Sequence, residues 1–102
     1  MQIQINASDV QSSDSISAHV TERVEAALGR WAEHVTRVEV HLHDVNGHKS
    51  GVDKSCKMEV RLKHHQPMMV EDMSDDLYEA VRGAAKKLTT RVQRTLEKLN
   101  RT

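Results

Sequence analysis

Hydrophobic and polar residues alternate with two different periods along the chain, and each period predicts a different kind of element. Near the N-terminus, residues 2–6 (Gln-Ile-Gln-Ile-Asn) alternate with a period of two, as a short half-buried strand does. The next apolar residues recur every three or four positions and predict an amphipathic helix: Ile16, Val20, Val24, Leu28 and Trp31. Ser13, Asp14 or Ser15 can cap this helix, because a side-chain oxygen there accepts a free N–H group of the first turn.

Three further strands are predicted by a return to the period of two. The first begins at Thr36 and buries Val38, Val40 and Leu42, and the second buries Cys56, Met58, Val60 and Leu62. Asn46-Gly47 and Gly51 mark a long polar connection between them. Residues 64–67 (His-His-Gln-Pro) are typical of a turn. Residues 68–71 are predicted to be a last strand, at the periphery of the sheet because Pro67 has no N–H group for a ladder.

A long final helix is predicted from about Asp75 to Leu99, with Ser74-Asp75-Asp76 at its capped, acidic start. Its periodic positions are Leu77, Val81, Ala84, Leu88, Val92, Thr95 and Leu99. The predicted order is therefore β-α-β-β-β-α, an α+β fold in which two helices pack on one face of a four-stranded, largely antiparallel sheet. At 102 residues we expect a single domain, residues 1–102.

The composition limits both the core and the compartment. Phe is absent, and Trp31 and Tyr78 are the only aromatic residues, so the core must be aliphatic and rows of stacked bases are excluded. We expect Met68, Met69 and Met73 to fill an irregular edge of that core. The lone Cys56 can form no internal disulfide and is predicted to be buried. Without a signal peptide or about 20 consecutive apolar residues, the predicted location is the cytoplasm, away from membranes.

Charge is balanced overall but unevenly distributed. The chain has 15 Lys and Arg and 15 Asp and Glu residues, yet residues 81–102 hold seven basic residues and one acid, Glu97. Five of these cations lie between about 240° and 320° from Leu77 around the final helix, just outside its apolar face. We call them the basic stripe: Lys87, Arg91, Arg94, Lys98 and Arg101. Lys86 lies near 180°, beside the stripe.

A stripe of this kind favours an anionic partner, because neighbouring cations repel one another by a few tenths of a kcal/mol per pair. The alternative is an ordinary solvated face whose cations complement the helix dipole. The strand that buries Cys56 carries further cations on its outer face: Lys57, Arg61 and Lys63. They extend the basic stripe if this face and the stripe point the same way. Otherwise they form a solvent face with Glu59 interleaved.

Other constellations that could carry chemistry are weak. His41 and His43 share a strand face and could offer imidazoles to zinc, with Asp44 or His48 as further ligands, but exposed histidines without a cysteine partner are commonly surface residues. The four glycines are scattered, so no phosphate loop is present, and no nucleophile arrangement is identifiable. We therefore expect no metal, no cofactor, no small-molecule substrate and no enzymatic activity.

The order of these motifs resembles the ribosome hibernation-promoting factor family, also called ribosome-associated translation inhibitor, protein Y or sigma-factor modulation protein. Residues 76–81 (Asp-Leu-Tyr-Glu-Ala-Val) look like the opening of the family's last helix, and Lys87-Leu88 with residues 91–96 resembles its basic continuation. Residues 1–5, 38–42 and 57–62 also fit in order, so the resemblance covers nearly the whole chain in its short form. It implies the same fold, which is similar to that of double-stranded-RNA-binding domains.

The resemblance implies a non-enzymatic protein that binds ribosomal RNA of the small ribosomal subunit and inhibits translation by idle ribosomes during stress. Lys87 and Arg94 match basic positions of the family's helix, and Arg91 is one place from its usual arginine. The predicted RNA-binding residues are Lys87, Arg94, Arg91, Lys98, Lys86, Lys57 and Arg61. Phosphate contacts by such residues give salt-sensitive binding of a folded RNA recognised by its shape.

Three features depart from the family and keep an alternative open. The first helix, which usually contributes cations, is acidic here, the net charge is zero rather than clearly positive, and the loop from Gly47 to Asp53 is longer than usual. The alternative is therefore a divergent protein-interaction or regulatory module that has kept the fold and no longer binds ribosomes. The resemblance does not include the dimerisation domain of long family members, and the predicted state is a monomer or a weak dimer.

Overall fold

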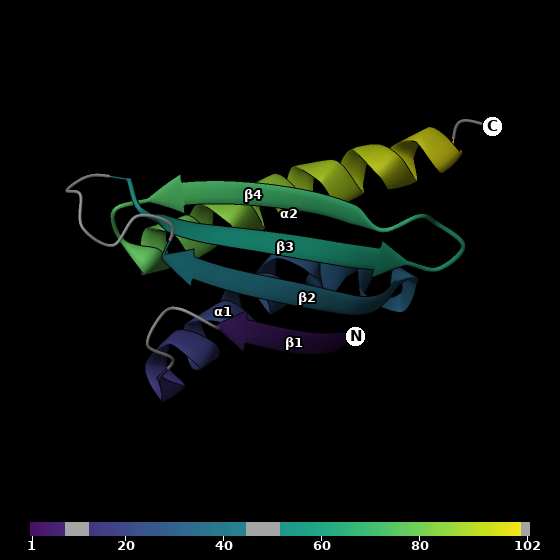
Figure 1. The fold of residues 1–102 in the computed structure, drawn as a ribbon. Coiled ribbons are helices and arrows are strands. Elements are labelled where there is room, and N and C mark those ends of the chain that lie inside the picture. Colours follow the sequence, from purple (N-terminus) through teal and green to yellow (C-terminus); the bar gives the residue numbers. More distant parts are fainter. Residues whose placement is uncertain (8–12, 45–51, 101–102) are drawn as a thin grey trace.

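Four strands form one mixed sheet in the computed structural model, which describes residues 1–7, 13–44 and 52–100 (Figure 1). The strands follow one another across the sheet in chain order: β1 (Gln2–Ala7), β2 (Val35–Asp44), β3 (Lys54–Leu62) and β4 (Met68–Ser74). β1 pairs with β2 in parallel, and the other two pairs are antiparallel. This confirms the predicted fold. His48, Arg101 and most of the predicted long loop lie outside the described residues.

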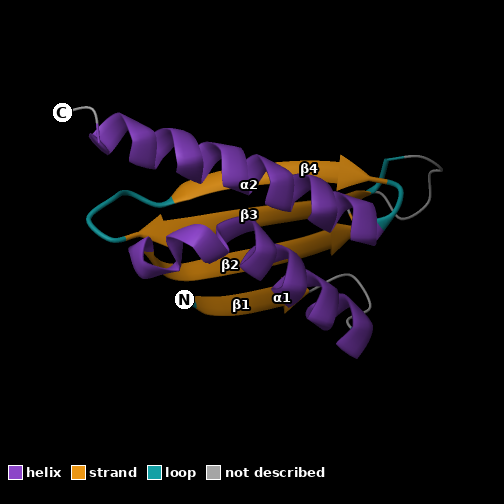
Figure 2. Cartoon of the chain, turned by 180° about the vertical axis from the view of Figure 1, so that it is seen from behind, coloured by secondary structure: helices purple, strands orange, loops and turns teal. Residues whose placement is uncertain are grey.

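Both helices cover the same face of the sheet, as predicted (Figure 2). They are α1 (Asp14–Leu28) and α2 (Leu77–Asn100), and a 3-10 helix, η1 (Gly29–His34), follows α1. Because α1 connects two neighbouring parallel strands, it crosses over the sheet between them. Ser13 caps α1: its Oγ accepts a hydrogen bond from the backbone N of Ile16 at 3.2 Å.

The first helix ends three residues before Trp31, which the periodicity had included in it. α1 ends at Leu28, and Trp31 adopts φ −116° and ψ 20°, outside helical geometry. Gly29 lies at the junction, where its low helix propensity weakens the last turn. The chain therefore turns toward β2 through η1, and the Trp31 side chain is only half-buried.

The core lies between the sheet and the two helices and is aliphatic, as predicted. Its residues come from the two helices α1 and α2 and from the central strands β2 and β3, while apolar side chains of the edge strands β1 and β4 and of η1 pack against it. Fully buried members include Val20 and Val24 of α1, Val38 and Val40 of β2, Met58 and Val60 of β3, and Val81, Leu88 and Val92 of α2. The predicted periodicities thus identify the core-facing positions of both helices and of the two central strands.

The prediction that all three methionines fill the core edge is wrong for two of them. β4 continues to Ser74 rather than stopping at Glu71, and its alternation places Met69 and Met73 opposite Glu59 and Ser55, on the sheet face that carries no helix. Their side chains are 48% and 40% exposed. Met68 points the other way and packs against the core.

The final helix begins at Leu77, two residues later than predicted, because Asp76 is its capping residue. Oδ1 of Asp76 accepts a hydrogen bond from the backbone N of Tyr78 at 2.9 Å. In the middle of α2, Oγ1 of Thr89 donates a hydrogen bond to the carbonyl oxygen of Ala27 at 3.0 Å and so links α2 to the end of α1. No helix in the described part of the chain combines the length and the apolar character needed to cross a membrane.

Candidate nucleic-acid interface

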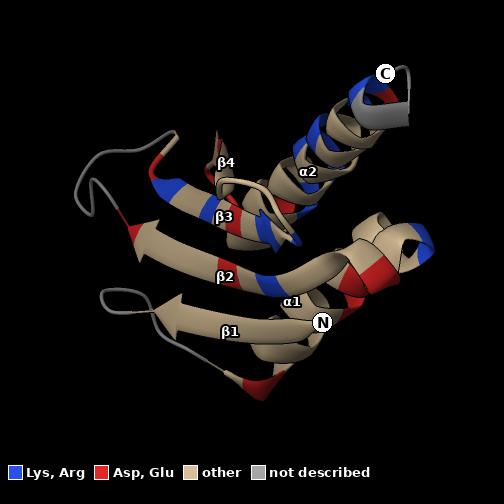
Figure 3. Ribbon diagram, turned by 90° about the vertical axis from the view of Figure 1, so that its right-hand side faces the viewer, with Lys and Arg blue, Asp and Glu red and all other residues tan. Residues whose placement is uncertain are grey.

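The basic stripe follows the flank of α2 that faces the edge strand β4. The helix buries Val81, Leu88 and Val92 in the core, so residues about a quarter-turn away emerge beside the sheet edge. Figure 3 shows the basic segments of α2 continuing to its C-terminal end, whereas α1 carries several acidic ones. Four of the five stripe residues lie in the described part of the chain, and all four are exposed: Lys87, Arg91, Arg94 and Lys98.

Arg91 and Arg94 lie in the middle of the stripe, and each lines two grooves. One groove, of about 490 Å³, also contacts Thr95, Glu97 and Lys98. The other, of about 390 Å³, lies between α2 and Val70 of β4 and is bordered by Lys86, Lys87 and Thr90. Among the described residues, no carboxylate forms an ion pair with Arg91, Arg94 or Lys98. These three cations are therefore available to an anionic ligand.

Lys87 differs from its neighbours because β4 supplies it with a carboxylate. Its Nζ lies 3.1 Å from Oδ1 of Asp72 and 2.8 Å from the carbonyl oxygen of Glu71. Within the helix the stripe has no acidic member, so this partner could not be read from the helical pattern. The charge of Lys87 is partly neutralised inside the protein, while its side chain stays 55% exposed.

A third groove lies between the two helices and brings two further basic residues, Arg23 of α1 and Arg82 of α2, together with the predicted Lys86. Alanines form much of the rest of its lining, and its volume is about 510 Å³. Arg82 also pairs with Glu79, one turn earlier. Nε of Arg23 is buried and has no hydrogen-bond partner in the described part of the structure.

This groove is continuous with the stripe, since Lys86 and Thr90 border both. Basic residues therefore extend from the helix pair across the exposed side of α2 to the edge of β4. Arg23 was obscured in the sequence because acidic residues surround it on α1. Its proximity to Lys86 depends on how the two helices pack.

Lys57 and Arg61 belong to the opposite face of the sheet. They alternate with Cys56, Met58 and Val60, whose side chains face the helices, and so they project from the uncovered side. The structure therefore does not bring them together with the basic stripe. Glu59 lies between these cations, as the alternative solvent-face interpretation expects, and it pairs at 3.2 Å with Arg61 of its own strand rather than across strands.

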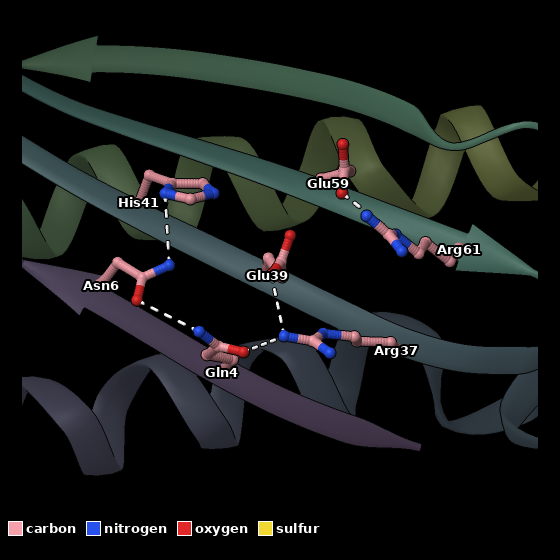
Figure 4. A network of polar contacts seen from close by, with 7 residues as sticks. All are labelled: Gln4, Asn6, Arg37, Glu39, His41, Glu59 and Arg61. Atoms are coloured by element: carbon pink, nitrogen blue, oxygen red, sulfur yellow. Dashed lines mark hydrogen bonds and ion pairs between the residues drawn. The ribbon is translucent and has the colours of Figure 1, made fainter.

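The uncovered face carries a polar network across β1 and β2, beside the separate Arg61–Glu59 pair of β3 (Figure 4). Arg37 donates to Gln4 on one side and pairs with Glu39 at 2.9 Å on the other. His41 lies 3.4 Å from the amide nitrogen of Asn6, so this histidine takes part in a hydrogen-bond network. Among the described residues, no group of three or more His, Cys, Asp or Glu side chains is placed to hold a metal ion, and His48 lies outside them.

Two neighbouring residues of β3, Ser55 and Cys56, are both buried. Ser55 precedes the core-facing Cys56 and therefore lies on the sheet face without helices, yet it is 1% exposed, and its Oγ donates to Oε2 of Glu71 at 2.9 Å. Cys56 is buried, as predicted, and burial together with the nearby Asp72 carboxylate raises the pKa of its thiol to about 12. A thiol with so high a pKa is a poor nucleophile at neutral pH.

Comparison with known proteins identifies relatives of this fold. The family model described as sigma 54 modulation protein / S30EA ribosomal protein matches residues 3–100. A ribosomal subunit interface protein from Coxiella burnetii superposes with a TM-score of 0.78 at 20% identity, over 95% of this chain and 99% of that one. The N-terminal domain of Protein Y from Thermus thermophilus gives 0.77 at 24% identity, over 93% and 99%. At these identities the two structures show the shared fold. No curated protein matches at a significant level.

Proposed function

The chain belongs to the sigma 54 modulation protein / S30EA ribosomal protein family, and we propose that it binds the small ribosomal subunit through ribosomal RNA phosphates and inhibits translation by idle ribosomes. Membership makes it one of a family of ribosome-associated modulation factors. The subunit, the inhibition and the RNA contacts are our proposal. The observation that carries it is the exposed set Arg91, Arg94 and Lys98 on one flank of α2, with which no carboxylate of the described residues forms an ion pair.

The geometry of α2 suits a folded RNA. Its 24 residues extend for about 36 Å at the usual helical rise, enough to meet several successive phosphates. Long flexible cations on an exposed helix contact phosphates without reading base edges, so binding should depend on shape and salt rather than on sequence. Lys86 continues this surface toward Arg23 and Arg82, which compensates in part for the acidic α1.

Binding of this kind inhibits translation because the protein occupies a site that other ligands of the ribosome need. A protein seated where messenger and transfer RNA lie on the small subunit excludes both, and no covalent step is required. We therefore expect a single-domain, non-enzymatic protein that acts in the cytoplasm as a monomer or weak dimer. Inhibition should disappear when the protein is released by salt, because counterion release weakens each phosphate contact.

Co-sedimentation with purified small ribosomal subunits tests the proposal. The wild-type protein should pellet with the subunits at low salt. The double variant Arg91→Glu/Arg94→Glu should bind at least about tenfold more weakly, because each reversal replaces an attraction to phosphate by a repulsion. Arg91 and Arg94 are chosen over Lys87 because the latter already pairs with Asp72.

The matched control is Lys57→Glu/Arg61→Glu, which changes the net charge equally on the opposite sheet face. This variant should still pellet, and it should inhibit in vitro translation as the wild type does. If both double variants are released equally, overall charge rather than the helix flank governs binding. If the wild-type protein stays in the supernatant at low salt, the alternative of a protein-interaction module on the same fold is correct.

A further inference from the structure

A separate groove lies between η1, the turn after β3 and the C-terminal half of α2. Its volume is about 490 Å³, within the range of small-ligand sites. The apolar part of its lining is Trp31, Leu62 and Leu96, and the polar part is Lys63 with three histidines, His34, His64 and His65. In the described part of the chain it shares no lining residue with the three grooves around the basic stripe.

Backbone hydrogen bonds hold the walls of this groove in place. The N–H of Lys63 donates to the carbonyl oxygen of His34 at 2.9 Å and so joins the end of η1 to the end of β3. The turn closes with a bond from the N–H of His65 to the carbonyl oxygen of Leu62 at 3.2 Å. His64 adopts a positive φ of 66°, an uncommon conformation for a residue other than glycine, and this turns the chain sharply beside the groove.

The lining of this groove combines an aromatic ring with a lysine side chain. Trp31 supplies an aromatic ring that is already in contact with Arg30, whose Cζ lies 5.1 Å from the ring centroid, and the ring still lines the groove. Among the described residues, no Asp or Glu is part of the lining, while Lys63 is exposed. A ligand that uses all of these groups combines a flat aromatic part with a negative charge.

We propose that this groove binds one unpaired nucleotide, with its base against Trp31 and its phosphate near Lys63. Aromatic side chains stack on unpaired bases, and cations beside them hold the adjoining phosphate. The chain has too few aromatic residues to stack a row of bases, but the single ring of Trp31 is enough to stack one base. An acidic peptide would satisfy Lys63 and leave the indole unused. That the nucleotide belongs to ribosomal RNA rests on the proposed function, whereas nucleotide binding itself does not.

Because Trp31 is the only tryptophan, its fluorescence reports on this groove alone. Adenosine and uridine 5′-monophosphates, and a short single-stranded oligoadenylate, should quench the emission saturably when it is excited at the red edge of tryptophan absorption. Ribose 5-phosphate and inorganic phosphate should compete at least about tenfold more weakly, because they lack the base that stacks. Equal competition by ribose 5-phosphate would show a simple anion site and overturn the proposal.

Two matched charge reversals localise the effect. Lys63→Glu should weaken nucleotide quenching about tenfold, and Arg94→Glu, outside this groove, should leave it unchanged. Trp31→Leu should lose binding of a fluorescently labelled oligoadenylate, as followed by anisotropy, with circular dichroism to verify folding. The proposal is overturned if nucleotides do not quench, or if both reversals weaken quenching equally. Loss of ribosome binding in Arg91→Glu/Arg94→Glu with intact quenching separates the two sites.

Discussion

The ammonium group of Lys87 lies 3.1 Å from Oδ1 of Asp72 and joins α2 to the edge strand β4. Lys87 also donates to the carbonyl oxygen of Glu71, so the edge strand holds this side chain at two points. The two side chains are 55% and 29% exposed, and an ion pair this accessible contributes only about 0–1 kcal/mol to stability. The contact therefore determines where the Lys87 charge points more than it stabilises the fold.

Replacing Asp72 by Asn should release Lys87 to the basic stripe. We expect RNA affinity to rise a few-fold at low salt, and the salt slope of binding to steepen by at most about 0.9, the value of one additional phosphate contact. The free energy of unfolding should fall by no more than about 1 kcal/mol. Binding of a structured RNA measured over a range of salt concentrations gives the slope directly. Glu25→Gln, an exposed change on α1 with the same effect on net charge, is the control; an equal gain in both variants would contradict a role for Lys87.

Gly83 is required by the close approach of Asp72 to α2. A Cβ atom built on Gly83 overlaps the carboxylate of Asp72, so Gly83→Ala must displace that side chain. We expect a loss of about 1–3 kcal/mol of unfolding free energy, despite the better helix propensity of alanine. The double variant Gly83→Ala/Asp72→Ala should recover much of this loss, because the small side chain leaves room. Urea denaturation of the four proteins of this cycle measures the coupling, and strictly additive effects would argue against the contact.

Thr89 should matter more than its neighbour Thr90. Oγ1 of Thr89 donates to the carbonyl oxygen of Ala27 at 3.0 Å, whereas Oγ1 of the exposed Thr90 reaches only Lys86 in its own helix. Thr89→Val preserves the shape and leaves the Ala27 carbonyl without this donor, so we expect a loss of about 1–2 kcal/mol. Thr90→Val should change the unfolding free energy by less than about 0.5 kcal/mol. Thermal denaturation of both variants measures this difference. If the two variants lose similar amounts of stability, the hydrogen bond from Thr89 to Ala27 contributes little to it.

Cys56 should make the protein less stable in alkali. Burial, and then the Asp72 carboxylate, raise the pKa of its thiol from 9.0 to about 12. As pH rises above 9.0, the unfolded chain therefore loses this proton before the folded protein does. The free energy of unfolding should fall across the window from pH 9.0 to about 12, by at most about 1.4 kcal/mol per pH unit.

Comparison with Cys56→Ala isolates this contribution, because the variant lacks the titrating thiol. Urea unfolding of both proteins across the window should show a steeper decline for the wild type. Thiol-specific reagents should label Cys56 only after denaturation. Parallel pH profiles for the two proteins would mean that the thiol titrates alike in the folded and unfolded states.

The candidate interface was only partly accessible from the sequence. Helical periodicity placed Arg91, Arg94 and Lys98 on one flank of α2, because their spacing is a property of a single helix. It could not show that Asp72 neutralises Lys87 in part, since that carboxylate comes from another strand. Nor could it join Arg23 to Lys86, because their proximity depends on how α1 packs against α2. The role of each residue in RNA binding stays a prediction.

By itself the sequence determined the features that one segment contains: the two hydrophobic periods, a helix cap among Ser13, Asp14 and Ser15, and the core positions from Val20 to Val92. Only the tertiary structure decided which faces meet. It placed Lys57 and Arg61 away from the basic stripe, exposed Met69 and Met73, and brought Trp31 to a groove with Lys63. The physical reason is that local periodicity fixes the direction of a side chain relative to its own backbone. Strand order and helix packing then decide what that side chain meets.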